Sequence, residues 1–408
     1  MSVSLGVIVA ALALVSPALA EPAPSFPDLL RQAEATSPRL AESLAQVRAA
    51  EGRARQASAR PNPELGLEVE NFGGGEPFDG FAVAETTLSV AQPLELGGKR
   101  GARIGAARAD VELARARQRQ TMADFAFDLA AAYAEAEAAD RRLVLAQEGL
   151  ELAQTDARAA RSLVDAGREA ELRAVQSNAA VSAARADLDE AQAARSTAFA
   201  RLTALAGSPT VFTSLDGSVL QDGPGQIAAP LAAQVTSPAV LAAEAEREAA
   251  ARRVRMERTR ATPDVTVAFG LRRFQGDDST ALVAGVSAPI PVFDRNQGNT
   301  AAAQGELQAA EARLNAARLD AEAELRSAQA QATAAQTRLA AATEGETTAA
   351  EAYRLARVGY DAGRLPLLEV LNARRTLAEA RARTLDARLA RLRSEAGLAR
   401  LQGRAYGA

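Results

Sequence analysis

The chain has 408 residues and a formal net charge of −4, and it contains no cysteine, histidine or tryptophan. Hydrophobic residues make up 48% of the sequence but aromatic residues only 4%, which excludes a core built mainly from large aromatic side chains. The missing residue types exclude disulfides and thiolate or imidazole metal sites. The scattered charges argue against nucleic acid as the main partner. Without histidine or cysteine an enzyme has little support, and we expect no cofactor.

The N-terminal segment is typical of an export signal. Residues 3–15 form an apolar run, and Ala18-Leu19-Ala20 matches a small-x-small cleavage pattern before Glu21. The run is shorter than the roughly 20 residues that a membrane anchor needs. No lysine or arginine precedes it, which departs from the usual signal pattern. We predict a signal peptide over residues 1–20 and expect no transmembrane helix in the rest of the chain.

The remaining sequence repeats itself. Four landmarks recur in the same order: Ser37-Pro38 as Ser237-Pro238, Pro63-Glu64 as Pro263-Asp264, Pro93 as Pro291, and Asp165-Ala166-Gly167-Arg168 as Asp361-Ala362-Gly363-Arg364. Ordered landmarks with a slowly drifting offset indicate two copies of one structural unit.

Each copy is predicted to contain a short helix, a strand hairpin, a long helix and a return helix. The first repeat covers residues 21–207, with a helix at 37–60, strands near 64–72 and 82–93, a long helix at 99–166 and a return helix at 168–206. The second covers 236–403, with a helix at 237–261, strands near 264–274 and 281–291, a long helix at 295–362 and a return helix at 364–402. A loop-rich linker at 208–235 and a tail at 404–408 complete the predicted layout.

The two long helical stretches contain no proline and are rich in alanine, the best helix former. At 1.5 Å per residue, each would reach roughly 100 Å. Helices of this length need neighbours in a coiled-coil-like array. The sequence therefore predicts a mostly α-helical fold with a smaller β-hairpin region.

The hairpins show the period of two that is typical of strands, as in Leu65, Leu67 and Val69. Segments of about ten such residues fit membrane-spanning β-strands, although soluble hairpins packed on helices give the same pattern. In a bilayer the backbone groups find no water, so the sheet must close, and four strands cannot enclose a lumen. Several chains would then share one barrel, and this argument leaves their number open.

The segments at 92–100 and 289–299, where a strand passes into a long helix, resemble the TolC-like outer-membrane efflux proteins, in particular the heavy-metal (cobalt–zinc–cadmium) branch. The duplicated layout extends the resemblance from about residue 27 to residue 403. It implies a homotrimer whose twelve-stranded barrel lies in outer-membrane lipid and continues as a helical tunnel into the periplasm. It also implies two partners, a periplasmic adaptor (membrane fusion) protein and an inner-membrane, proton-driven RND-type pump.

The strand–helix junctions contain residues with clear backbone roles. Pro93 and Pro291 are expected to end strand pairing because proline has no N–H to donate. Gly97 and Gly98 allow backbone angles that are closed to other residues. Asp294 is expected to cap a helix that begins at the next residue.

The resemblance implies that the two helix breaks form the periplasmic tip, where the tunnel closes and the adaptor docks. It therefore makes the turn residues candidate adaptor contacts: Gly167, Arg168, Gly363 and Arg364. Glu369 matches the first of two acidic residues that ring the narrowest point of the family's tunnel, and Asn372 stands where the second is expected. A ring of three Glu369 side chains would favour cations; a solvated surface carboxylate is the alternative interpretation.

The first repeat has Arg173 and Gln176 at the equivalent positions. Arg173 is expected to pair with an acid on a neighbouring helix and to lock the closed state.

Four other functions remain open from the sequence. The channel could serve drug efflux or protein secretion, because the metal cargo depends on resemblance alone. An exported coiled-coil scaffold without a pore would explain the helices but not the four strands. A periplasmic adaptor also has long helical hairpins, but adaptors combine one hairpin with compact β-domains, whereas this chain repeats one unit twice.

Overall fold

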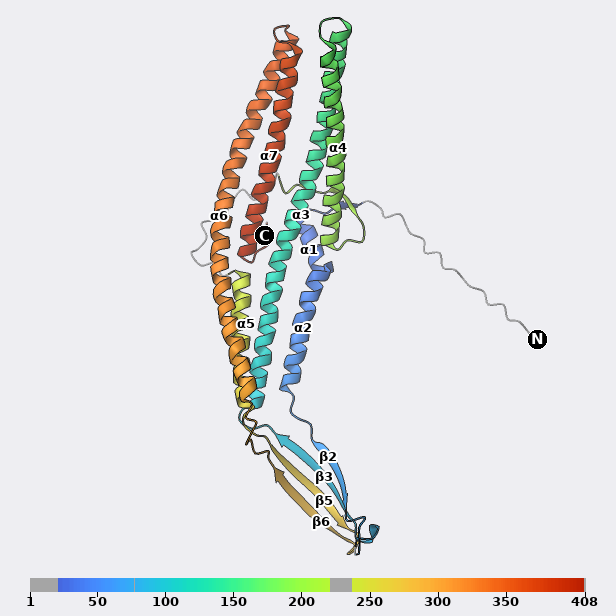
Figure 1. Cartoon of the computed structure of the whole chain (residues 1–408), viewed down its shortest axis with the longest axis vertical. Helices are drawn as coiled ribbons and strands as arrows, with labels where there is room; N and C mark the ends of the chain where they lie inside the picture. The colour runs from blue at the N-terminus through green and yellow to red at the C-terminus, as the bar shows by residue number, and fades with distance from the viewer. Residues whose placement is uncertain (1–20, 77, 221–236, 407–408) are drawn as a thin grey trace, which may run out of the picture.

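The structure is a computed structural model that describes residues 21–76, 78–220 and 237–406 (Figure 1). The molecule is long and narrow, with a small sheet at one end and helices that run from it to two hairpin tips at the other (Figure 1). The predicted signal peptide and residues 221–235 of the predicted linker lie outside the described residues. Within the described part, no helix combines the length and apolar character needed to cross a bilayer.

The sheet combines strands from both halves of the chain, in the order β2-β3-β5-β6, and every neighbouring pair is antiparallel. The strands are β2 (Glu64–Glu70), β3 (Glu85–Leu94), β5 (Val265–Phe274) and β6 (Ser279–Ser287). A 3-10 turn, η1 (Phe81–Val83), precedes β3. Each half contributes one hairpin, and the halves meet where β3 pairs with β5.

The helices next to the sheet lie side by side in the same order as the strands to which they are joined. They are α2 (Pro38–Ser58), α3 (Lys99–Asp165), α4 (Glu171–Ala206), α5 (Pro238–Thr259), α6 (Gln297–Asp361) and α7 (Leu367–Leu401). Near the sheet, α2 packs on α3, α3 on α5, and α5 on α6. Farther away, α4 returns along α3 and α7 returns along α6. The long helices α3 and α6 have 67 and 65 residues, so each spans roughly 100 Å.

The main core lies where α3 passes the inner ends of α4 and α7. Here α1 (Phe26–Thr36) packs on α3, and β1 (Glu21–Ala23) pairs in parallel with β4 (Phe212–Leu215). The largest fully buried side chains are Leu29, Leu129, Tyr133, Leu202 and Leu392. Alanines 134, 136 and 138 of α3 are also completely buried, so little side chain separates this helix from its neighbours. Alanine thus allows these helices to pack closely.

The observed elements differ from the predicted ones in several places. β3 begins at Glu85 because η1 occupies the first predicted positions, and β6 ends at Ser287 instead of residue 291. α6 begins at Gln297 instead of residue 295. β1 and β4 were not predicted, since strands of three and four residues are too short to show a period. α1, a helix of 11 residues, was missed as well.

Candidate channel wall, junctions and helical tips

One face of the sheet is apolar. The register places Leu67 opposite Leu88, Leu88 opposite Leu271, and Leu271 opposite Leu282. Because side chains alternate along a strand, the large exposed residues of all four strands share this face: Leu65, Leu67, Val69, Leu88, Val90, Leu94, Phe269, Leu271, Leu282 and Val286. Such a face is suited to lipid hydrocarbon, as on the outside of a membrane barrel.

The opposite face is polar and rich in small residues. Arg272 of β5 lies on it and binds three side chains: Glu85 at 3.0 Å and Thr87 at 2.9 Å on the adjacent β3, and Glu70 at 2.9 Å on β2, one strand further away. Glu64 and Glu68 share this face and form no ion pair within the described chain. The face therefore carries more acid than base, and it is suited to line an aqueous lumen.

The sheet is open at both sides, because β2 and β6 each have one neighbour in the described chain. Unpaired backbone groups at such edges are costly in hydrocarbon, where no water can satisfy them. A sheet with one lipid-facing surface must therefore find further strands to pair with.

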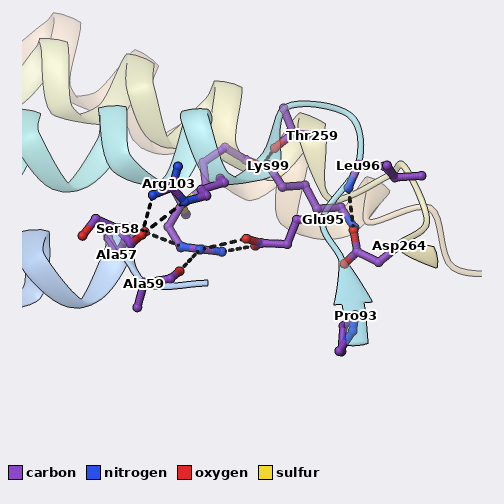
Figure 2. Close-up of polar contacts among 12 residues, drawn as sticks. Ala57, Ser58, Ala59, Pro93, Glu95, Leu96, Lys99, Arg103, Thr259 and Asp264 are labelled. Carbon is purple, nitrogen blue, oxygen red and sulfur yellow. Dashed lines mark hydrogen bonds and ion pairs between the residues drawn. The ribbon is translucent and has the colours of Figure 1, made fainter. Parts of the chain in front are cut away.

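The junction between β3 and α3 is held by a cluster of charged side chains (Figure 2). The Arg103 guanidinium donates to the carbonyls of Ala57 and Ala59, both at 2.9 Å, and it pairs with the carboxylate of Glu95. Arg100 donates to the carbonyl of Ser58 at 2.8 Å. These bonds satisfy the carbonyls at the end of α2 and fix it to the start of α3.

The same junction is tied to the second half of the chain. Lys99 Nζ lies 2.8 Å from Oδ1 of Asp264, and the Leu96 amide donates to the same oxygen at 3.1 Å (Figure 2). Burial alone would raise the pKa of Asp264, but the hydrogen bonds from Lys99 and Leu96 and the charges of Lys99 and Arg103 lower it below its ordinary value. Asp264 therefore stays ionised next to Lys99 at the start of β5.

The predicted roles of Gly97 and Gly98 agree with their backbone angles, which are left-handed with φ of 66° and 75°. At Gly97 a Cβ atom would also lie 2.6 Å from the Thr262 hydroxyl, so only glycine fits there. Pairing does not stop at Pro93, as expected, but continues one residue further, because Pro93 stands opposite Thr266 and Leu94 opposite Val265.

The prediction for Asp294 was wrong. The residue before α6 is Asn296, which takes a left-handed conformation with φ of 57°, and no side chain caps this helix. Asp294 instead accepts a 2.8 Å hydrogen bond from the Asn296 amide, and Asn296 Nδ2 donates to the Glu257 carbonyl at 2.8 Å. Pro291 lies beyond the end of β6, in the connection between β6 and α6.

The two helix breaks lie at the end of the molecule that is farthest from the sheet (Figure 1). Gly167 and Gly363 have φ of 69° and 70°. Arg168 donates its amide to the Leu163 carbonyl, and Arg364 donates to that of Gly359. This 6→1 bond after a left-handed glycine is the Schellman C-cap, and it leaves the arginine side chains exposed at the tips.

The structure brings two of the four predicted gate residues to one cavity. Arg173 and Asn372 both line a cavity of about 440 Å³ between the α3–α4 hairpin and α7. Arg173 pairs with Asp156 at 3.3 Å, so its partner lies on the adjacent helix of its own hairpin. Glu369 and Gln176 are exposed and do not line this cavity. Among the described residues, no group of three or more carboxylates could hold a metal ion.

Sequence reasoning missed one buried carboxylate. Glu137 on α3 is 5% exposed and accepts hydrogen bonds from the Val219 amide at 2.8 Å, the Leu220 amide at 3.1 Å and the Ser218 hydroxyl. Burial and the nearby charges of Glu137 and Asp216 raise the pKa of Tyr133 to about 12. The available signal was a glutamate in the alanine-rich segment 129–139.

A two-faced sheet with open edges, continued by long helical hairpins, defines a class of outer-membrane channel proteins. The chain belongs to the outer membrane efflux protein family, whose model matches residues 29–208 and 230–404. It is therefore an outer-membrane efflux channel subunit whose helices extend into the periplasm. The role of this family is transport, not catalysis.

Three relatives have metal-resistance names. Nickel and cobalt resistance protein CnrC of Cupriavidus metallidurans is 45% identical over 281 residues, which cover 69% of this chain and 67% of the relative. Nickel-cobalt-cadmium resistance protein NccC of Alcaligenes xylosoxydans xylosoxydans is 43% identical over 281 residues, covering 69% and 64%. Cobalt-zinc-cadmium resistance protein CzcC of C. metallidurans is 32% identical over 358 residues, covering 85% and 82%.

Solved channels share the fold. A crystal structure of CusC superimposes with a TM-score of 0.78 at 22% identity, covering 93% of this chain and 92% of CusC. The open state of the MtrE outer-membrane channel of Neisseria gonorrhoeae gives a TM-score of 0.77 at 19% identity, covering 93% and 89%. At these identities the likeness establishes the fold alone.

Proposed function

We propose that this subunit is the exit duct of a tripartite, proton-driven efflux system and that its cargo is divalent heavy-metal cations. The observation that supports the duct is the sheet, which has a lipid-suited face, a polar face and two open edges. The cargo is supported by the names of the relatives, which refer to nickel, cobalt, cadmium and zinc resistance.

The assembly that we propose is a homotrimer. Three copies supply twelve strands, more than the roughly eight at which side chains fill a barrel interior. With the apolar face toward lipid, the polar face with Glu64, Glu68 and Arg272 lines the lumen. The helices below it then form the wall of a periplasmic tunnel.

We place the gate at the helical tips. Glu369 and Asn372 in the second repeat, and Arg173 and Gln176 in the first, lie within three helical turns of a break. The ion pair between Arg173 and Asp156 would hold the α3–α4 hairpin in its resting arrangement.

The tip turns are our candidate contacts for the periplasmic adaptor, which links the channel to an inner-membrane RND-type pump. Arg168 and Arg364 are exposed there, next to the left-handed Gly167 and Gly363. Substituting Arg168 and Arg364 with Glu should lower efflux without lowering the amount of protein in the outer membrane. Arg326→Glu, at an exposed arginine along α6, is the matched control.

The test is growth of a strain that lacks this protein, with and without complementation, on nickel, cobalt, zinc, cadmium and a panel of drugs. We expect hypersensitivity to the metals alone, restored by the wild-type chain. Sensitivity to drugs alone would keep the channel and reject the metal cargo. Growth unaffected by any compound, together with no conductance of the purified protein in planar bilayers, would favour a scaffold without a pore.

A further inference from the structure

The two hairpins have the same internal register, which makes equivalent positions in the two halves identifiable. Gly66 lies opposite Ser89 in the first hairpin, and Thr266 lies opposite Ser287 in the second. Residues of β5 thus stand 200 positions after their equivalents in β2, and residues of β6 stand 198 after theirs in β3. The sequence landmarks Pro63/Pro263 and Pro93/Pro291 show the same two offsets.

Within the described chain the two halves pair along one strand contact, between β3 and β5. The equivalent contact, between β6 and β2, is not formed, because both are edge strands. β3 of the first half pairs with β5 of the second, with Leu94 opposite Val265 and Gln92 opposite Val267. In a closed ring, β6 of one copy must pair in the same way with β2 of the next. Applying the offsets places Val292 opposite Leu65 and Ile290 opposite Leu67 of the next copy.

The exposed residues at these positions agree with this register. Leu65 and Leu67 are 74% and 69% exposed, and Ile290 and Val292 are 82% and 59% exposed. The register also continues the apolar face across the contact, since Leu65 and Leu67 belong to that face.

The length of β6 supports the same register. The last residues of β3, Gln92–Leu94, pair with β5 alone, because the β2 pairing stops at Ala91. Their equivalents, residues 290–292, lie beyond the end of β6 at Ser287. Residues 290–292 therefore lack strand structure in the single chain, and they are the residues whose pairing partner would come from another copy.

Charge completes the contact. Within the chain, Lys99 at the start of α3 pairs with Asp264 before β5. The equivalent acid, Glu64, is exposed and has no ion pair in the described chain. Arg295, which is the single basic residue between positions 288 and 300, precedes α6 and is also exposed. Its Nε donates to the Pro291 carbonyl at 3.2 Å, so both Nη groups remain for a carboxylate.

We propose that β6 of one copy pairs with β2 of the next in the register that places Ile290 opposite Leu67, with Arg295 of the first copy bound to Glu64 of the second. The proposal rests on the homotrimer proposed above and adds the residues that close it. A subunit contact thus repeats the contact between the two halves of one chain.

The natural absence of cysteine allows a direct test. Directly opposed residues of antiparallel strands have Cα atoms about 4.5–5.5 Å apart, which a disulfide can bridge. Oxidising outer membranes that contain the Leu67→Cys, Ile290→Cys variant should give covalent dimers and trimers that disappear on reduction. Two matched pairs should give none: Val69→Cys with Ile290→Cys, shifted by two residues, and Leu65→Cys with Val286→Cys, roughly 20 Å out of register.

The ion pair has its own test. Glu64→Lys and Arg295→Glu should each lower the temperature at which the detergent-solubilised assembly dissociates, and the two together should restore it. Glu68→Lys combined with Arg295→Glu is the matched control and should restore nothing.

The outcomes distinguish a failure of the proposed strand register from a failure of the proposed trimer. Cross-links in a shifted pair, or none in any pair while native mass spectrometry shows trimers, would overturn the register and leave the channel assembly standing. A chain that stays monomeric in membranes and detergent would overturn the assembly itself.

Discussion

The amide of Val219 donates a 2.8 Å hydrogen bond to the carboxylate of Glu137, joining the segment after the first repeat to the middle of α3. Glu137 is buried and accepts two further bonds there, so its removal leaves two amides without an acceptor. We expect Glu137→Ala to reduce the free energy of unfolding by about 2–4 kcal/mol. Thermal unfolding followed by helical circular dichroism measures this. Glu346→Ala, at a half-exposed glutamate lining a cavity beside Glu137, should change little; equal losses in both variants would contradict the assigned role.

Arg103 gives a second prediction, at the barrel–tunnel junction. Its planar guanidinium reaches two carbonyls of α2 and the Glu95 carboxylate at once, a geometry that lysine cannot reproduce. Both Arg103→Ala and Arg103→Lys should therefore destabilise the protein, the first by about 2–3 kcal/mol. Arg108→Ala, at an exposed arginine of the same helix, serves as the control. Full stability of Arg103→Lys would mean that charge alone holds the junction.

A pH dependence is expected at Glu395 on α7. Burial raises the pKa of this carboxyl, although the Arg391 charge and the Tyr406 hydroxyl act in the opposite direction. The folded state therefore keeps the proton to higher pH than the unfolded state, and stability falls as pH rises from the ordinary value of 4.5 through the folded pKa. Glu395→Gln should melt higher than the wild type at pH 7, with the difference shrinking toward pH 4.

The control for this effect is Glu379→Gln, at an exposed glutamate of the same helix. It should show no such pH-dependent difference. A Glu395→Gln variant that melts lower than the wild type at pH 7 would show that the ion pair with Arg391 outweighs burial.

The ion pair between Arg173 and Asp156 gives a prediction about gating. Removing it deletes a charged link between α4 and α3 near the tip, so Arg173→Ala should increase single-channel conductance in planar bilayers. Asp156→Asn should act in the same direction, because either change breaks the same pair. Arg158→Ala removes an exposed arginine whose side chain donates to Thr155 on the same helix and should leave conductance unchanged. If Arg173→Ala also leaves it unchanged, the pair does not hold the resting state.

Strong periodic signals made the architecture predictable. The duplication, the proline-free helices and the alternation of Leu65, Leu67 and Val69 appear in the fold at the expected places. Prediction from local sequence failed where contacts with distant parts of the chain determine the backbone conformation. Asn296 takes the left-handed position before α6 and bonds to the end of α5, so the expected cap at Asp294 does not form.

The candidate site was predictable in part. Arg173 was expected to pair with an acid on a neighbouring helix, and Asp156 is that acid. The Arg103 cluster was not foreseen, because it joins Glu95 to carbonyls more than thirty positions earlier. Such contacts depend on how α2 lies against α3, which no local pattern encodes.

The first and last segments that the structure describes meet in one core. The centroids of the Phe26 and Tyr406 rings lie 6.3 Å apart. Ala23 of β1 is completely buried, and β1 pairs with β4. Segments that lie far apart in the sequence, around Phe26 and around Tyr406, must therefore both be in place before this core is complete. A chain that lacks the segment around Tyr406 would leave the Phe26 ring without one of the aromatic rings packed against it.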